Sequence, residues 1–148
     1  MTAAFPHKYE VGLRWDGNGP ATVAEPPRMP IVAGPPEEFG GQKEWWSPEH
    51  LLLSSLALCL QTTLQAIAAK ARLPIGGFGC QAIGTLDKTH AGLAFTSLTL
   101  DVAVSVDEAD GPRAEEILRT AKRHCLIANS LNVPVELKAR VLVRQTVA

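Results

Sequence analysis

The chain has 148 residues, the length of one ordinary domain with a single hydrophobic core. Apolar residues make up 46% and charged residues 20%, a composition typical of globular rather than disordered proteins. The formal net charge is −1 and the sequence has no run of lysine and arginine, so we expect no nucleic-acid partner.

The N-terminal part reads as short extended segments joined by turns. Residues 8–15, KYEVGLRW, alternate between apolar and polar side chains and stop at DGNGP, which predicts a strand followed by a turn. Residues 21–34, ATVAEPPRMPIVAG, give two short extended pieces separated by prolines, and PPEEFGGQ is a loop.

The first predicted helix begins after Ser47. Ser47 suits the N-cap, Pro48 the first helical position, and Glu49 the first turn, where the helix dipole favours a negative charge. The helix should run to about Arg72 and be ended by Pro74 and the glycines after it.

The second half predicts a hairpin, a helix and a final strand. Residues 78–88 and 93–106 form the hairpin around THAG, and residues 110–131 form one second helix. Residues 133–147 are the final strand. We therefore expect a single α+β domain over residues 1–148, with the helices segregated against an antiparallel sheet.

Targeting signals are not evident. The start, MTAAFPHKYE, contains no apolar stretch of the kind that signal peptides carry. No uninterrupted apolar run approaches the roughly 20 residues that span a bilayer. We expect a cytoplasmic protein that does not associate with a membrane.

The three cysteines are Cys59, Cys80 and Cys125. They form no CxxC pair and no zinc-like spacing, so we expect neither a secreted disulfide framework nor a structural metal site, and no cofactor. In a reducing compartment each is either an inert core thiol or a reactive one.

The first helix is hydrophobic most of the way round, which indicates a homodimer. A helix that is apolar on all sides is buried on all sides, and one chain has little protein to surround it. A second copy solves this problem if the helix lies near the dimer centre; the alternative is a helix with one exposed apolar face. The apolar residues concerned are Leu51, Leu52, Leu53, Leu56, Leu58, Leu60, Leu64 and Ile67.

Glu49 and Cys59 lie ten residues apart on this helix. At a rise of about 1.5 Å per residue, roughly 15 Å separates them along the axis, so they do not meet within one chain. If they share a site, the carboxylate comes from the other subunit. Helical spacing surrounds Cys59 with Ser55, Thr62 and Thr63, which predicts that the thiol lies on a polar seam rather than among leucines.

Two segments carry a family resemblance. PPEEFGGQKEWWSPEHLLLSSLALC, residues 35–59, places Pro48 and Glu49 ahead of Cys59, and RHCLIANSLNVPVEL, residues 123–137, carries Cys125 late in the second helix. Together they resemble the OsmC/Ohr family of thiol-dependent hydroperoxide reductases, in element order from about Tyr9 onward. The resemblance implies an OsmC-like fold, an intertwined homodimer with long central helices wrapped by antiparallel sheets.

The same resemblance implies roles for the two cysteines. Cys59 would attack the peroxide O–O bond as a thiolate and become a sulfenic acid, releasing the alcohol. Cys125 would then condense with it to a disulfide, recycled by a dithiol reductant of lipoyl or thioredoxin type. Because only a thiolate is nucleophilic, a cation is needed nearby; in the family an arginine held by the carboxylate corresponding to Glu49 supplies it.

The arginine departs from the family pattern. The family places it in a glycine-rich turn after the first strand, and the corresponding turn here, WDGNGPATV, contains none. Arg14 precedes the turn and Arg28 follows it; strand alternation places Arg14 toward solvent, which favours Arg28. If neither serves, the protein is a relative with weak or altered activity.

Other candidates favour structural roles. Cys80 lies in a strand and is interpreted as a core residue, and His50 and His124 as structural or surface residues. Trp45 and Trp46 either cap the dimer core or line an apolar entry. Two functions remain open: a cysteine peroxidase for organic hydroperoxides, and a non-enzymatic dimeric module that binds an apolar small ligand in the interface cleft.

Overall fold

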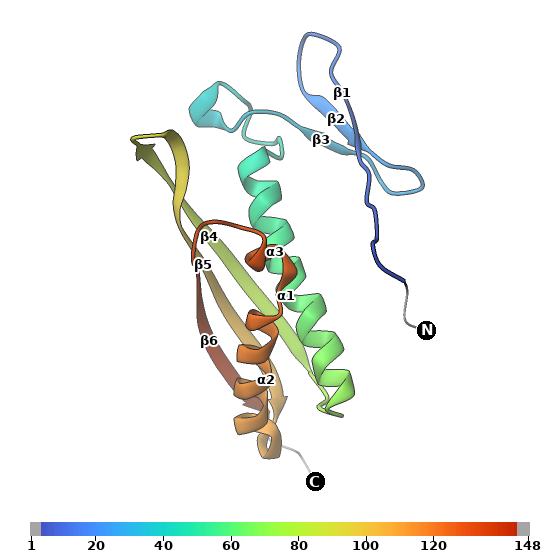
Figure 1. Ribbon diagram of the computed structural model, residues 1–148, viewed down its shortest axis with the longest axis vertical. Helices are drawn as coiled ribbons and strands as arrows, with labels where there is room; N and C mark the ends of the chain where they lie inside the picture. Colours follow the sequence, from blue (N-terminus) through green and yellow to red (C-terminus); the bar gives the residue numbers. More distant parts are fainter. Residues whose placement is uncertain (1–3, 145–148) are drawn as a thin grey trace. The chain divides into compact units, whose positions relative to one another are not determined.

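The computed structural model describes residues 4–144, which form two compact units. The first unit extends to Leu51 and the second begins at Leu52. The helix α1, Pro48–Lys70, runs through this boundary as one continuous helix (Figure 1). The final strand predicted for residues 133–147 extends in part beyond residue 144, outside the described residues.

The first unit contains a small antiparallel sheet of order β1-β2-β3. Leu13 lies opposite Val23, and Val23 lies opposite Ile31. The first strand is shorter than its sequence predicts, because its partner β2 has only four residues and lies between Pro20 and Pro26. The elements are β1 (Gly12–Arg14), β2 (Ala21–Ala24), β3 (Ile31–Ala33) and the 3-10 turn η1 (Glu37–Phe39).

The start of α1 confirms the predicted N-cap. Ser47 is fully buried, and its Oγ accepts a hydrogen bond from the backbone N–H of His50 at 3.2 Å. The same Oγ lies 2.6 Å from Nδ1 of the His50 ring. The cap therefore satisfies the backbone N–H at the third helical position. The His50 imidazole forms a second hydrogen bond with the same serine hydroxyl.

The second unit contains a mixed sheet of order β4-β5-β6 (Figure 1). The predicted hairpin is confirmed as the antiparallel pair β4 (Gly77–Thr89) and β5 (Gly92–Asp107). The prediction of a wholly antiparallel sheet is wrong, because β6 (Val135–Arg144) pairs parallel to β5. The connection through η2 (Glu108–Asp110) and the following helices returns the chain to the end of the sheet where β5 began, as parallel neighbours require.

The predicted second helix is broken at Cys125. Helix α2 covers Gly111–Arg123, and the short helix α3 covers Leu126–Asn129. Cys125 has φ −68° and ψ 104°, an extended conformation that ends one helix before the next begins. The Asn129 side chain donates a hydrogen bond to the carbonyl of Arg123 at 3.0 Å, which satisfies a terminal carbonyl of α2 across the break.

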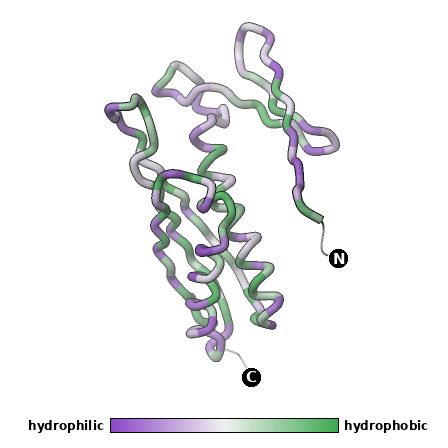
Figure 2. The backbone as a smooth tube through the Cα atoms, viewed as in Figure 1, coloured by the Kyte–Doolittle hydropathy of each residue, from purple (hydrophilic) through white to green (hydrophobic). Residues whose placement is uncertain are grey.

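One hydrophobic cluster joins α1, α2 and the mixed sheet. The alternation predicted for β5 is confirmed, because every second side chain from Leu98 to Val106 is buried. Leu56, Leu60 and Leu64 of α1 are buried in the same cluster at a spacing of one helical turn. In Figure 2 hydrophilic residues mark much of α2, and the buried residues of this helix are Ala114, Leu118 and Ala121.

By length and composition alone, α1 also meets the criterion for a membrane-crossing helix. Its 23 residues include an 18-residue window of mean hydropathy 1.6. The sequence predicts no membrane-spanning helix because polar residues interrupt the apolar stretch of α1. Core helices of water-soluble proteins meet this criterion as well. In the second unit α1 contributes to the hydrophobic cluster.

Replacing the N-cap serine should destabilise the protein. Ser47→Ala removes the acceptor for the His50 N–H in a fully buried position, so we expect the free energy of unfolding to fall by about 1–2 kcal/mol. Ser54→Ala, at an exposed position of the same helix, is the matched control and should change it by less than about 0.5 kcal/mol. Urea denaturation measures both; equal losses would contradict the capping role.

Candidate functional site

Cys59 lies in the middle of α1 and belongs to the hydrophobic cluster. Its side chain is 8% exposed. The predicted polar seam is wrong, because Cys59 packs in the hydrophobic cluster with leucines of the same helix. The Ser55 hydroxyl donates to the carbonyl of Leu52 at 2.8 Å, and the Thr62 hydroxyl donates to the carbonyl of Cys59 at 3.2 Å. Helical serine and threonine often bond to carbonyls of the preceding turn in this way, so these hydroxyls are used by the backbone.

Cys125 lies at the junction between α2 and α3. Its side chain is 1% exposed and belongs to the same cluster as Cys59. The backbone there is held by the N–H of Asn129, which donates to the carbonyl of Cys125 at 3.0 Å. The break in the helix therefore leaves Cys125 at a fixed corner of the core rather than on a continuous helix.

The two thiols are neighbours. Burial raises the pKa of the Cys125 thiol, and the adjacent Cys59 thiol also raises it, while hydrogen bonds from the backbone N–H groups of Ala128 and Ile127 act in the opposite direction without reversing the shift. Two elements that are distant in sequence thus bring one cysteine each to the same place, and both cysteines are free thiols. Such a pair can exchange between dithiol and disulfide states.

Cys80 occupies β4 opposite Val102 and is half-buried. Its pKa is raised by burial and, to a smaller extent, by the negative charge of Asp101. A thiol held in its protonated form is a poor nucleophile. The position agrees with the interpretation of Cys80 as a small residue packed against the core.

Glu49 lies in the first turn of α1, as its sequence predicts. Its Oε2 atom is buried and has no hydrogen-bond partner within residues 4–144. Buried carboxylate oxygens are normally paired, so this atom is a place where a donor is needed. Ten residues of helix separate it from Cys59, which is about 15 Å along the axis.

The two candidate arginines lie in the first unit. Arg14 of β1 pairs with Asp16 at 3.6 Å, and both side chains are about four-fifths exposed, at 81% and 80%. Arg28 is exposed and follows β2 in a turn where its N–H donates to the carbonyl of Glu25 at 3.0 Å. Among the described residues neither arginine forms an ion pair with Glu49. The activating role of Arg28, or of Arg14, stays a prediction.

Neither of the two remaining aromatic candidates is fully buried. Trp45 is half-buried and lines a hollow of the first unit together with Trp15, and Trp46 is 49% exposed. Trp46 also pairs with Ala33 as an isolated bridge. His124 is the C-cap of α2 and is exposed, a surface position.

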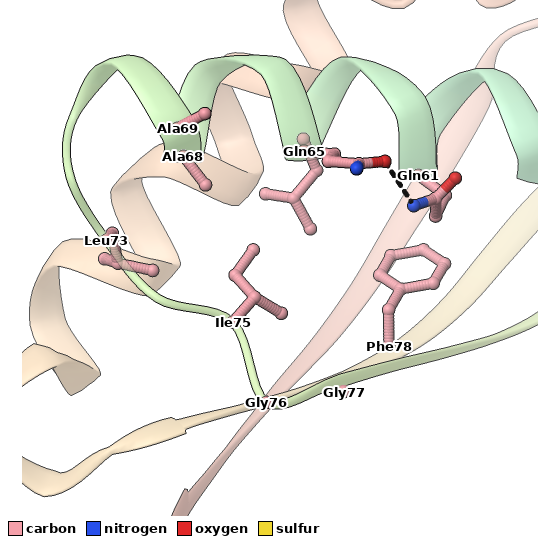
Figure 3. Close-up of a pocket in the computed structure, with 10 residues that line it drawn as sticks. Gln61, Gln65, Ala68, Ala69, Leu73, Ile75, Gly76, Gly77 and Phe78 are labelled. Carbon is pink, nitrogen blue, oxygen red and sulfur yellow. Dashed lines mark hydrogen bonds between the residues drawn. The ribbon is translucent and has the colours of Figure 1, made fainter.

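The second unit also contains a cavity of about 420 Å³, which the sequence did not predict (Figure 3). Two glutamines of α1 stand at its edge, where Nε2 of Gln61 donates to Oε1 of Gln65 at 3.1 Å. The only sequence signal was the spacing of these glutamines by four residues, which places them on one helix face. The lining residues are Gln61, Leu64, Gln65, Ala68, Ala69, Leu73, Ile75, Gly76, Gly77 and Phe78.

The cavity has the size and character of small-ligand sites, which are mostly apolar with a few polar groups. Figure 3 shows Ile75 and Phe78 pointing toward α1 from the other side of the cavity. Because Gln61 and Gln65 bond to each other, one amide oxygen and one amide nitrogen are left for a ligand. Within residues 4–144 no group of three or more metal-ligating side chains gathers.

Comparison with protein families identifies the family of the chain. The model of the family described as OsmC-like protein matches residues 40–139. The chain belongs to the OsmC-like protein family. The match includes Glu49, Cys59 and Cys125 but not Arg14 or Arg28, which precede it.

Individual relatives are similar at low identity. The Peroxiredoxin OsmC of Escherichia coli K12 is 28% identical over 99 residues, which are 67% of this chain and 68% of that protein. An OsmC-like protein of unknown function from Vibrio cholerae has a TM-score of 0.83 at 19% identity, covering 91% of this chain and all of that one (100%). An organic hydroperoxide resistance protein from Elizabethkingia anophelis has a TM-score of 0.73 at 17% identity, covering 95% and 100%. The fold is OsmC-like and α+β.

Oxidation should join Cys59 to Cys125 and leave Cys80 free. The first two thiols are neighbours, and a disulfide needs Cα atoms within about 7 Å of each other. Peptide mapping after one equivalent of cumene hydroperoxide should find the 59–125 bridge. Cys80→Ser is the control and should give the same bridge, whereas a bridge that contains Cys80 would overturn the assignment.

Proposed function

We propose that this protein is a thiol peroxidase that reduces organic hydroperoxides to alcohols. The observation that carries the proposal is the pair of neighbouring buried thiols, Cys59 and Cys125. Family membership supports it, because relatives are named Peroxiredoxin OsmC and organic hydroperoxide resistance protein. We place the activity in the cytoplasm, as part of the response to oxidative stress.

The two cysteines have unequal chemistry, which supports an order of events. Cys125 is the more deeply buried and its pKa is raised, so it remains a neutral thiol at neutral pH. Cys59 is the more exposed of the two, at 8% against 1%, so a peroxide reaches it first. Cys59 is therefore the peroxidatic cysteine, and Cys125 is the resolving cysteine.

The proposed reaction has three steps. The Cys59 thiolate attacks one peroxide oxygen, the O–O bond breaks, and the alkoxide takes a proton and leaves as the alcohol. The Cys125 sulfur then attacks the sulfenic acid sulfur, forming the disulfide and releasing water. A dithiol of lipoyl or thioredoxin type reduces the disulfide, becoming oxidised itself.

The thiolate of Cys59 needs a cation, and the buried Oε2 of Glu49 needs a donor. One guanidinium satisfies both, and we propose Arg28 for this role, with Arg14 as the alternative. Because about 15 Å of helix separates Glu49 from Cys59, the carboxylate that serves each Cys59 comes from a second copy of the chain. The proposed active site is therefore complete only in a homodimer.

Exposed apolar side chains support the homodimer. The first unit exposes large apolar side chains, among them Tyr9 at 91%, Met29 at 86% and Leu13 at 68%. A three-stranded sheet with strands this short is marginal without a surface to cover it. In α1, Leu58 is 62% exposed directly beside Cys59 in sequence. A partner subunit would remove this apolar surface from water.

The cavity below Gln61 and Gln65 favours a second candidate function. A non-enzymatic dimeric module could bind a small apolar ligand there, with the free amide groups holding a polar end. This candidate predicts that wild type quenches or shifts the fluorescence of anilinonaphthalene sulfonate without consuming peroxide. Ala69→Phe, which fills the exposed side of the cavity, should abolish that binding.

Replacing the peroxidatic cysteine should abolish activity. Cys59→Ser should reduce cumene hydroperoxide consumption, with dithiothreitol present, to the rate without protein, because a serine hydroxyl is not ionised at neutral pH. Cys80→Ser is the matched control and should stay within about twofold of wild type, since its thiol is held protonated. Full activity of Cys59→Ser would exclude the mechanism.

Replacing the activating arginine should slow the reaction without dissociating the protein. Arg28→Met should cut peroxide reduction by at least about tenfold, the size of a ~1.4 kcal/mol effect on the barrier. Arg14→Met, whose guanidinium pairs with Asp16, is the comparison and should have little effect. Alkylation of Cys59 by iodoacetamide at neutral pH should slow in parallel. If neither replacement slows a measurable reaction, no arginine of the first unit activates Cys59.

Assembly can be tested without any assay of activity. Sedimentation velocity at micromolar concentration should find a dimer, because one chain leaves too much apolar surface in water. Leu58→Glu, which places a charge on the exposed face of α1, should shift the equilibrium toward monomer, whereas Gln65→Glu should not. A folded wild-type monomer would remove both the dimer and the two-chain active site.

A further inference from the structure

A hollow of about 390 Å³ on the second unit is lined on one side by three cationic side chains. Arg119, Lys122 and Arg123 of α2 stand along it, and Leu137 and Ala139 of β6 form its apolar side. We call these five residues the basic groove. The three cations share one side of α2 because they are spaced by three and four residues, although the sequence contains no run of basic residues.

Arg119 and Arg123 of the basic groove are exposed, and Lys122 is half-buried. Arg119 is 3.9 Å from Glu115 across an exposed pair, an arrangement that contributes little. Arg123 donates one hydrogen bond to the Thr120 hydroxyl at 3.0 Å. Among the residues that the structure describes, neither Lys122 nor Arg123 forms an ion pair. The groove is thus positive on a protein whose net charge is −1.

The basic groove adjoins the segment that carries the resolving cysteine. Arg123 is the last residue of α2, two positions before Cys125. The bond from the Asn129 side chain to the Arg123 carbonyl fixes the end of α2 to α3, with Cys125 between them. A molecule bound in the groove therefore lies beside the chain segment that carries Cys125. In the proposed function the disulfide between Cys125 and Cys59 must be reduced after each turnover.

We propose that the basic groove docks an acidic segment of the protein that carries the reducing dithiol. The inference rests on the proposed peroxidase function. Complementary charge raises the rate of encounter more than it raises affinity, which suits a partner that must bind and leave at every cycle. In the docked complex the partner's two thiols become a disulfide, the Cys59–Cys125 disulfide is reduced, and the two protons pass to the cysteines.

The test compares two synthetic dithiol peptides of equal length, each with two cysteines, one flanked by glutamates and the other by serines. The measurement is the rate constant for reduction of the oxidised protein. At low ionic strength the acidic peptide should be faster by at least about tenfold, and the difference should vanish near about 0.5 M salt. Lys122→Glu/Arg123→Glu should remove the advantage of the acidic peptide.

The matched control is Lys70→Glu/Lys88→Glu, the same change in charge at exposed positions of α1 and β4 that do not line the groove. It should keep the advantage of the acidic peptide at least fivefold, by the same electrostatic reasoning. Dithiothreitol, which is uncharged, should reduce wild type and both variants at equal rates. Loss of the acidic advantage in the control to the same extent as in the groove variant would overturn the proposal, because only net charge would then matter.

A binding measurement separates this proposal from the peroxidase function. A fluorescein-labelled oligoglutamate without cysteines should bind wild type and the control variant, detected by anisotropy, and not the groove variant, whatever the redox activity. No binding to wild type would overturn the proposal even if peroxide is consumed. Tighter binding of a DNA oligonucleotide of equal charge would also overturn it, since the groove would then recognise phosphate.

Discussion

The packing of α1 into the core of the mixed sheet is the constraint on which the candidate site depends. Leu56, Leu60 and Leu64 fix the rotation of the helix, because they share a hydrophobic cluster with the buried side chains of β5. Once that face is buried, Cys59 must enter the same cluster. The cap at Ser47 fixes where the helix begins, and hence how far along it each residue lies.

Burial in this cluster favours neutral thiols, whereas the proposed reaction needs one ionised thiol. Desolvation keeps a thiol neutral, which suits Cys125 and Cys80, whose pKa values are raised. In the proposed mechanism Cys59 must instead ionise, which requires a favourable charge that its hydrophobic neighbours do not supply. The carboxylate of Glu49 has the complementary difficulty, because its buried Oε2 has no hydrogen-bond donor within residues 4–144. In the proposed site one guanidinium satisfies both groups and the carboxylate comes from a second copy, so assembly is part of the proposed chemistry.

Much of the fold follows from local signals in the sequence. The cap at Ser47, the hairpin of β4 and β5 and the buried alternation of β5 were predicted because each depends on residues close together in the chain. The parallel direction of β6 was missed because an apolar alternation is the same for either direction of pairing. The break at Cys125 was missed because Ile127 and Ala128 continue the helical spacing of apolar residues.

Some features of the candidate site were also predicted from the sequence, and others were not. Family resemblance indicated Cys59 and Cys125, and the structure brings the two thiols together, which spacing alone could not predict. The polar seam around Cys59 was predicted wrongly. Helical spacing gives the side of the helix on which a hydroxyl lies, but not whether that hydroxyl bonds to the helix backbone. The basic groove was invisible as a run of charge, since it forms only when α2 packs beside β6.

The parallel pairing of β5 with β6 has a consequence for the order in which the molecule is made. Leu98 lies opposite Val135, so the three-stranded sheet cannot be completed until β6 has been synthesised. The segment that carries Cys125 precedes β6 and is anchored by it only at that stage. A nascent chain that lacks β6 therefore has an incomplete sheet beside the cluster that Cys59 and Cys125 share.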